Sequence, residues 1–215
     1  MRVLVILLGL MWVVPAMAAA QTYDLLFREG VLSDIHLGEA LTYFKATDRS
    51  SSPKDGSGDK VSLAITPEKT ATLTLEHGGK HRQLGSFPAS VGNPVIMYFL
   101  ETTVRDMAAQ AGGSPFYIRN RIKEALLGEA EIVPVKLSYN DREVDGQRVT
   151  LHPFSADKAR DKMGGFADLA LAVTVSDEIP GWYYSLVASA PLKAGSDQPG
   201  YSSSITLISG QKGRQ

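Results

Sequence analysis

The chain has 215 residues, with 22 lysine and arginine residues, 23 aspartate and glutamate residues and no cysteine, and its formal net charge is −1. This balance lacks the basic excess with which nucleic-acid-binding proteins contact phosphates. The absence of cysteine excludes disulfide bonds and thiol catalysis. The fold must therefore be stabilised by an ordinary hydrophobic core.

The first twenty residues predict a cleaved secretory signal. Arg2 precedes an apolar run over residues 3–14, which is shorter than the roughly 20 apolar residues that cross a bilayer. A proline ends the run, and alanines follow at four of the next five positions, as in signal cleavage sites. We expect cleavage after Ala18 or Ala20, no transmembrane span after cleavage, and a periplasmic or secreted protein with one domain over residues 21–215. An uncleaved N-terminal anchor is the alternative.

Most of the remaining patterned segments alternate apolar and polar side chains with a period of two, which predicts half-buried strands. About eight such segments occur, at residues 41–46, 61–66, 71–76, 133–139, 147–151, 168–176, 183–190 and 203–208. Hairpin signals occur at residues 77–80, 140–147 and 193–200. Because no helix separates most neighbouring strands, we expect a mainly antiparallel sheet with one dry face.

Two polar segments interrupt this pattern. Residues 48–60 are rich in serine, glycine and aspartate, and we expect them to form a flexible loop. Residues 155–165 begin with a serine that can cap a helix and continue with a polar helical composition. They predict a short surface helix.

Two longer helices are predicted in the middle of the chain. Asn93 and Pro94 are a strong helix start, and two glycines end the first helix after residues 94–111. Its first two turns are apolar nearly all round, which predicts burial. A second Ser-Pro start opens an amphipathic helix over residues 115–127, and the short junction predicts a sharp corner between the two helices.

A sheet with one apolar face needs a cover, and a helix that is apolar all round needs to be enclosed. We therefore expect an α+β fold in which a curved, half-barrel-like sheet of about eight strands packs on the buried first helix, while the second helix caps the opening. This arrangement resembles the half-barrel plan of periplasmic lipoprotein carriers and related envelope proteins. The resemblance concerns the arrangement of the elements, and it assigns no role to any single residue.

The chemical motifs that can be tested predict no catalytic, cofactor or metal site. No G-x-S-x-G elbow or P-loop occurs, and the Gly-Gly turn beside His77 and His81 does not fix metal ligands on one face. Acid–base catalysis by a pair of carboxylates is an alternative that these motifs do not test. Glu101, Arg105 and Asp106 are the first candidates for such a site, because the pKa of a charged group near an apolar core can be perturbed. A periplasmic hydrolase that uses unidentified carboxylates is therefore one alternative function.

We expect the protein to be an exported, non-enzymatic binding or envelope-accessory protein that holds an apolar small molecule, a lipid or an envelope protein. The candidate surface or ligand contacts are Tyr98, Glu101, Arg105, Tyr117, Arg119, Arg121, Lys123 and Trp182. The basic second helix could contact an anionic membrane surface, although such contacts typically use about 4 to 8 cations. A structural or interaction protein at the membrane surface is the other alternative. Trp182 could stack on a glycan, although aromatic residues at a strand start more often pack.

Overall fold

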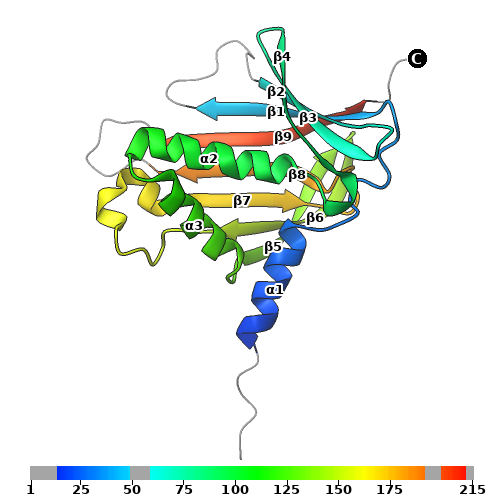
Figure 1. The fold of residues 1–215 in the computed structure, drawn as a ribbon. Coiled ribbons are helices and arrows are strands. Elements are labelled where there is room, and N and C mark those ends of the chain that lie inside the picture. The colour runs from blue at the N-terminus through cyan, green and yellow to red at the C-terminus, as the bar shows by residue number, and fades with distance from the viewer. Residues whose placement is uncertain (1–13, 49–58, 192–199, 212–215) are drawn as a thin grey trace, which may run out of the picture.

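The computed structural model describes residues 14–48, 59–191 and 200–211. These residues form an α+β fold with one nine-stranded antiparallel sheet, which does not close on itself (Figure 1). The strands are β1 (Ala40–Asp48), β2 (Asp59–Ile65), β3 (Thr70–His77), β4 (Lys80–Pro88), β5 (Glu131–Tyr139), β6 (Arg142–Leu151), β7 (Ala170–Val175), β8 (Tyr183–Ala190) and β9 (Tyr201–Gln211). Their order across the sheet is β4-β3-β2-β1-β9-β8-β7-β6-β5.

Three helices accompany the sheet: α1 (Val14–Leu26), α2 (Val95–Ala111) and α3 (Pro115–Leu126). Helices α2 and α3 lie over one face of the sheet, and α1 extends away from the side of β5 and β6 (Figure 1). Short 3-10 segments occur at η1 (Ala89–Val91), η2 (Arg160–Lys162) and η3 (Gly164–Asp168). No helix among the described residues is both long enough and apolar enough to span a membrane.

The antiparallel sheet and the two central helices are confirmed, and three details of the prediction are wrong. Strand β4 was not predicted, because it lies at the sheet edge and contains no buried residue that could produce alternation. The hairpin predicted at residues 140–147 is confined to Asn140 and Asp141, which both have positive φ, and β6 begins at the next residue. Residues 155–165 contain 3-10 turns in place of an α-helix.

Several predicted features lie outside the described residues. They are residues 1–13 of the predicted signal, residues 49–58 of the predicted flexible loop and residues 193–199 of the last predicted hairpin. The described part of the predicted signal, residues 14–20, belongs to α1.

Helix α2 starts at a buried polar junction. Asn93 Oδ1 accepts a hydrogen bond from the Val95 N–H at 3.1 Å, which caps the helix. Its amide nitrogen donates to Tyr43 Oη on β1 at 3.0 Å and to the Gly181 carbonyl before β8 at 2.7 Å. Gly181 has φ +73°, and a Cβ there would lie 2.3 Å from Leu41 Cδ1, so glycine is required. Asn93 thus joins the start of α2 to β1 and to the turn before β8.

Helix α2 buries one broad side and exposes the other. Its buried residues are Val95, Ile96, Phe99, Leu100, Thr103, Val104, Asp106 and Met107. Met97 in the first turn is 54% exposed, and Glu101 and Arg105 are exposed as well. The first two turns therefore keep a solvent-facing side, in contrast to the burial nearly all round that their composition predicts.

Candidate binding groove

An apolar groove lies where the three helices meet. It has a volume of about 680 Å³ and is bounded by the end of α1, the segment between β4 and α2, one side of α2 and the second half of α3. Its lining residues are Tyr23, Phe27, Glu29, Phe87, Pro88, Val91, Gly92, Asn93, Pro94, Ile96, Met97, Leu100, Glu101, Val104, Arg119, Ile122, Lys123, Leu126, Leu127 and Tyr183.

Two helical stripes supply the buried apolar part of the groove. Ile96, Leu100 and Val104 recur every four residues on α2, and Ile122 and Leu126 do so on α3. Residues four apart lie on one side of a helix, so each helix presents a continuous apolar stripe to the same space. All five side chains are at most 9% exposed.

The outer part of the groove consists of apolar side chains that are exposed. Nine large hydrophobic residues are exposed in the described part of the chain, and five of them line this groove. They are Tyr23, Phe87, Val91, Met97 and Leu127, with exposed fractions between 37% and 62%. Single exposed hydrophobic residues are ordinary, but a contiguous apolar patch marks an interaction or ligand site.

Four charged side chains of the described residues line the groove, and they differ in whether they form an ion pair. Arg119 donates to both carboxylate oxygens of Glu101, at 3.1 Å and 3.0 Å, and so links α3 to α2. Lys123, one helical turn further along α3, has no ion-pair partner among the described residues. Glu29 lies beside the segment between β4 and α2, because the next residue donates its N–H to the Ser90 carbonyl.

Buried phenol and indole groups hold the end of α1 against the sheet. The Tyr183 hydroxyl donates to the Leu26 carbonyl, and Trp182 Nε1 donates to the Leu25 carbonyl at 2.8 Å. Burial raises the pKa of Tyr183 far above its usual range, so the phenol stays protonated. The Arg28 guanidinium lies 4.4 Å from the centre of the Trp182 ring and binds Asp177. These contacts fix the α1 wall of the groove.

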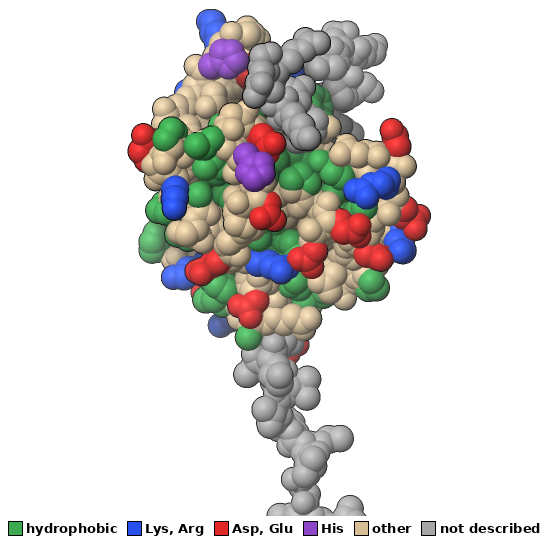
Figure 2. Space-filling model, turned by 90° about the vertical axis from the view of Figure 1, so that its right-hand side faces the viewer, with side chains coloured by type: hydrophobic (Ala, Val, Ile, Leu, Met, Phe, Trp, Pro, Cys, Tyr) green, Lys and Arg blue, Asp and Glu red, His purple; other side chains and the backbone are tan. Residues whose placement is uncertain are grey.

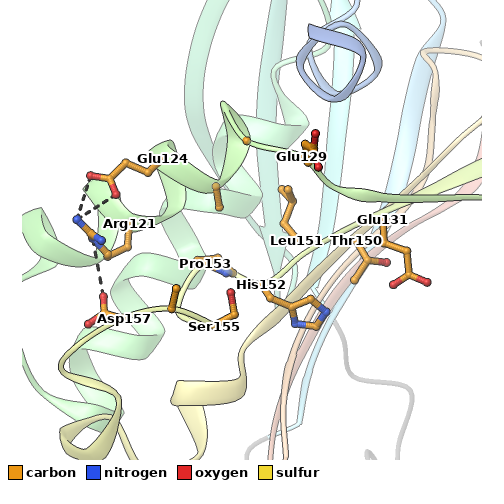
Figure 3. A pocket seen from close by; sticks show the side chains of 13 residues that line it. Arg121, Glu124, Glu129, Glu131, Thr150, Leu151, His152, Pro153, Ser155 and Asp157 are labelled. Carbon is orange, nitrogen blue, oxygen red and sulfur yellow. Dashed lines mark hydrogen bonds and ion pairs between the residues drawn. The ribbon is translucent and has the colours of Figure 1, made fainter. Parts of the chain in front are cut away.

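A second, polar pocket of about 430 Å³ lies on the other side of α3 (Figure 3). Asp157, whose side chain is 1% exposed, lies at one end of it, beside Arg121 and Glu124. Asp157 accepts hydrogen bonds from the Tyr117 hydroxyl at 2.8 Å and from the Ala159 N–H at 2.7 Å. Arg121 Nε lies 3.8 Å from Asp157 Oδ2, and the same guanidinium donates to Glu124 at 3.0 Å.

The environment of Asp157 favours its charged form. Burial by itself raises the pKa of this carboxyl, but the hydrogen bonds from Ala159 and Tyr117, together with the charges of Arg121 and Arg160, outweigh burial and hold the pKa below its usual range. The Tyr117 phenol has a raised pKa, first because it donates a hydrogen bond to Asp157. Asp157 is thus held in its charged form by its neighbours, although Arg121 Nε beside it is buried without a hydrogen-bond partner in the described part of the chain.

The structure distributes the predicted contact residues over several places. Glu101, Arg119 and Lys123 line the apolar groove, whereas Tyr117 and Arg121 belong to the cluster around Asp157. Trp182, expected at the surface, is only 5% exposed. Tyr98 is half-buried outside the groove, and burial raises its pKa. Arg105 donates to the backbone carbonyl of Glu101 at 3.3 Å, while the Glu101 carboxylate binds α3.

The carboxylates that were singled out do not converge on a cleft. Glu101 lies at the groove and binds Arg119, while Asp106 is buried and accepts a hydrogen bond from the Tyr201 hydroxyl on β9 at 3.1 Å. Among the described residues, no group of three histidine, aspartate or glutamate side chains could hold a metal ion. On the face that Figure 2 shows, acidic and basic side chains are intermixed and no patch of one sign gathers.

Sequence reasoning missed most of the apolar groove residues. Tyr23 in α1 and Phe27 just after its end are four residues apart, and their ring centres are 4.9 Å apart, a spacing that could have marked an aromatic face. Phe87 and Val91 come from an edge strand and a 3-10 turn, where no periodicity identifies them. No protein-family model matches the chain, and no curated protein matches it at a significant level.

Proposed function

We propose that this protein is an exported, non-enzymatic binding protein that holds an apolar ligand in the groove between α1, α2 and α3. The observation that carries the proposal is the gathering of five exposed hydrophobic side chains around an apolar space of about 680 Å³. Ligand pockets typically measure about 300–1,000 Å³ and are lined mainly by apolar side chains with a few polar groups. The groove has this size and composition.

The energetic reason lies in the exposed apolar area. Each square ångström of apolar surface that a ligand covers contributes roughly 25 cal/mol, and the five exposed hydrophobic side chains of the groove offer such surface. The proposed ligand site lies among the helices, beside the end of the edge strand β4. We also propose the half-barrel form of the sheet. Figure 1 shows β3 and β4 turned relative to β1 and β9, which supports it.

Export by a cleaved signal belongs to the same proposal. Among the described side chains of α1, the buried ones are Thr22 and Leu26, and both follow the two expected cleavage positions. The Thr22 hydroxyl also accepts a hydrogen bond from the Ala130 N–H at 3.2 Å, just after α3. Cleavage after Ala18 or Ala20 would therefore leave the docked turn of α1 and the groove wall in the mature protein.

The groove can be tested with an apolar fluorescent probe, N-phenyl-1-naphthylamine, and two matched variants of the mature protein. Met97→Glu places a charge at the groove, and Ile208→Glu makes the same kind of change on β9, where the side chain is similarly exposed, at 51% against 54%. We expect Met97→Glu to weaken probe binding about tenfold, because it removes apolar contact worth roughly 1.4 kcal/mol. Ile208→Glu should bind like the wild type.

Two outcomes would overturn the proposal. One is the absence of saturable probe binding to the wild-type protein, and the other is equal probe affinity of the two variants. Native mass spectrometry of protein purified from its own cell envelope provides the independent measurement. A retained small molecule supports the proposal, whereas a retained protein chain in its place assigns the groove to a protein partner.

A further inference from the structure

The charges of the groove point to the class of its ligand. We propose that the groove binds an acyl-chain amphiphile with an anionic head group, and that Lys123 holds this head group. The inference rests on the proposed function, because it assumes that the apolar part of the groove receives an apolar chain.

The second half of α3 combines the two chemistries that such a ligand needs. Ile122 and Leu126 are buried in the groove wall, and Lys123 follows Ile122 directly and also lines the groove. A chain that lies on the apolar stripe would therefore bring its head group within reach of a flexible ammonium. Lysine keeps its charged end in water while its apolar stem covers a hydrophobic surface, so it suits this position.

Four other polar side chains of the groove, those of Asn93, Tyr183, Arg119 and Glu101, already have partners. The Asn93 side chain makes three hydrogen bonds, and the Tyr183 hydroxyl donates to the Leu26 carbonyl. Arg119 is held by both oxygens of Glu101. Within the described part of the chain, Lys123 is thus the cation of the groove that has no carboxylate to neutralise it.

The charge of Glu29 would influence the orientation of an amphiphile in the groove. Glu29 lines the groove just after α1, and the following residue is hydrogen-bonded to Ser90 in the segment between β4 and α2. The Glu29 carboxylate would repel an anionic head group from that part of the groove and favour the orientation that places the head group at Lys123. A cationic amphiphile would reverse both effects, so the sign of the preferred head group is a decisive observable.

The test uses ligands with the same twelve-carbon chain and different head groups: laurate, dodecyl phosphate, dodecanol and dodecylammonium. Each displaces the fluorescent probe from the mature protein below its micelle-forming concentration. We expect the two anions to bind more tightly than dodecanol, and dodecylammonium to bind most weakly. The difference between laurate and dodecyl phosphate tells a carboxylate ligand from a phosphate ligand.

The matched variants are Lys123→Gln and Lys80→Gln. Both remove one positive charge, but Lys80 is exposed at the start of β4 and does not line the groove. Lys123→Gln should weaken laurate binding about three- to fivefold, the size of a partly exposed ion pair, and leave dodecanol binding unchanged. Lys80→Gln should change neither.

Each contrary result has a distinct meaning. If dodecanol displaces the probe as well as laurate does, or if Lys123→Gln leaves laurate affinity unchanged, the inference about the head group is wrong while the groove stands. If dodecylammonium binds most tightly, the inference is also wrong, and Glu29 becomes the selecting group. If no twelve-carbon ligand displaces a probe that binds the wild-type protein, the acyl-chain inference is wrong while the groove stands; if the probe itself does not bind, the proposed function fails.

Discussion

The two sides of α3 differ in whether their side chains find partners within the protein. On one side, Asp157 accepts hydrogen bonds from Tyr117 and Ala159 and forms an ion pair with Arg121, whose buried Nε has no hydrogen-bond partner among the described residues. On the other side, exposed apolar residues such as Met97 and Leu127 surround a space that the protein does not fill. The polar cluster stabilises the fold, whereas the groove has unused binding capacity. Substitutions on the two sides should therefore affect different measurements.

The largest expected effect belongs to the polar cluster. Asp157→Ala should lower the free energy of unfolding by about 2–4 kcal/mol, because it removes a buried acceptor and leaves the Ala159 N–H, the Tyr117 hydroxyl and Arg121 without it. Glu124→Ala is the control, since Glu124 binds the same arginine but its side chain is 60% exposed. That variant should lose less than about 1 kcal/mol. Urea denaturation of both variants measures the difference, and equal losses would contradict a structural role for Asp157.

The second largest loss of stability is expected at the buried junction of Asn93 at the start of α2. Asn93→Ala should lower the free energy of unfolding by about 1–3 kcal/mol, because it leaves the buried Gly181 carbonyl without its donor and removes the cap of α2. Thermal denaturation checks the loss. Probe affinity per folded molecule should stay within about twofold, since the apolar groove residues are intact. A stable variant would show that this junction does not hold α2.

The pH dependence of stability should also depend on the polar cluster. The pKa of Asp157 is lower in the folded protein than its ordinary value of 3.8, so the stability that it contributes is fully present above that value. This contribution is lost as the pH falls through the folded-state pKa. The difference in unfolding free energy between wild type and Asp157→Asn should therefore be constant from pH 5 to pH 7 and shrink below about pH 4. A difference that grows on acidification would reverse the assigned direction of the pKa shift.

Much of the fold could be predicted because its determinants are local. Strands with one buried face, such as β2 and β8, alternate in sequence, and the Asn93-Pro94 start marks the beginning of α2 within one residue. Strand β4 could not be found in this way, since an edge strand without buried residues has no alternation. Periodicity identifies which face of an element is buried, but it does not tell which buried faces meet.

The groove was missed for that reason, and one error was avoidable. The groove joins Tyr23, Phe87 and Leu127, which come from three separate segments. By contrast, Arg119, Arg121 and Lys123 were grouped as one basic surface, although two residues correspond to about 200° around a helix. That angle places Arg121 on the opposite side from its two neighbours, and the structure pairs it with Asp157 there. Helical geometry alone could have separated a groove cation from a structural one.

The smallest expected change in stability gives the sharpest contrast between the two sides of α3. Glu101→Gln removes the partner of Arg119, and because both side chains are about half exposed, at 46% and 50%, the loss should be only about 0.2–1 kcal/mol. The freed guanidinium then lies one turn from Lys123 at the same groove, so laurate should bind about two- to fivefold more tightly and dodecanol unchanged. Glu124→Gln is the matched control, because it frees part of Arg121 on the polar side. Equal gains in laurate affinity from the two variants would show that net charge, and not the position of the cation at the groove, controls binding.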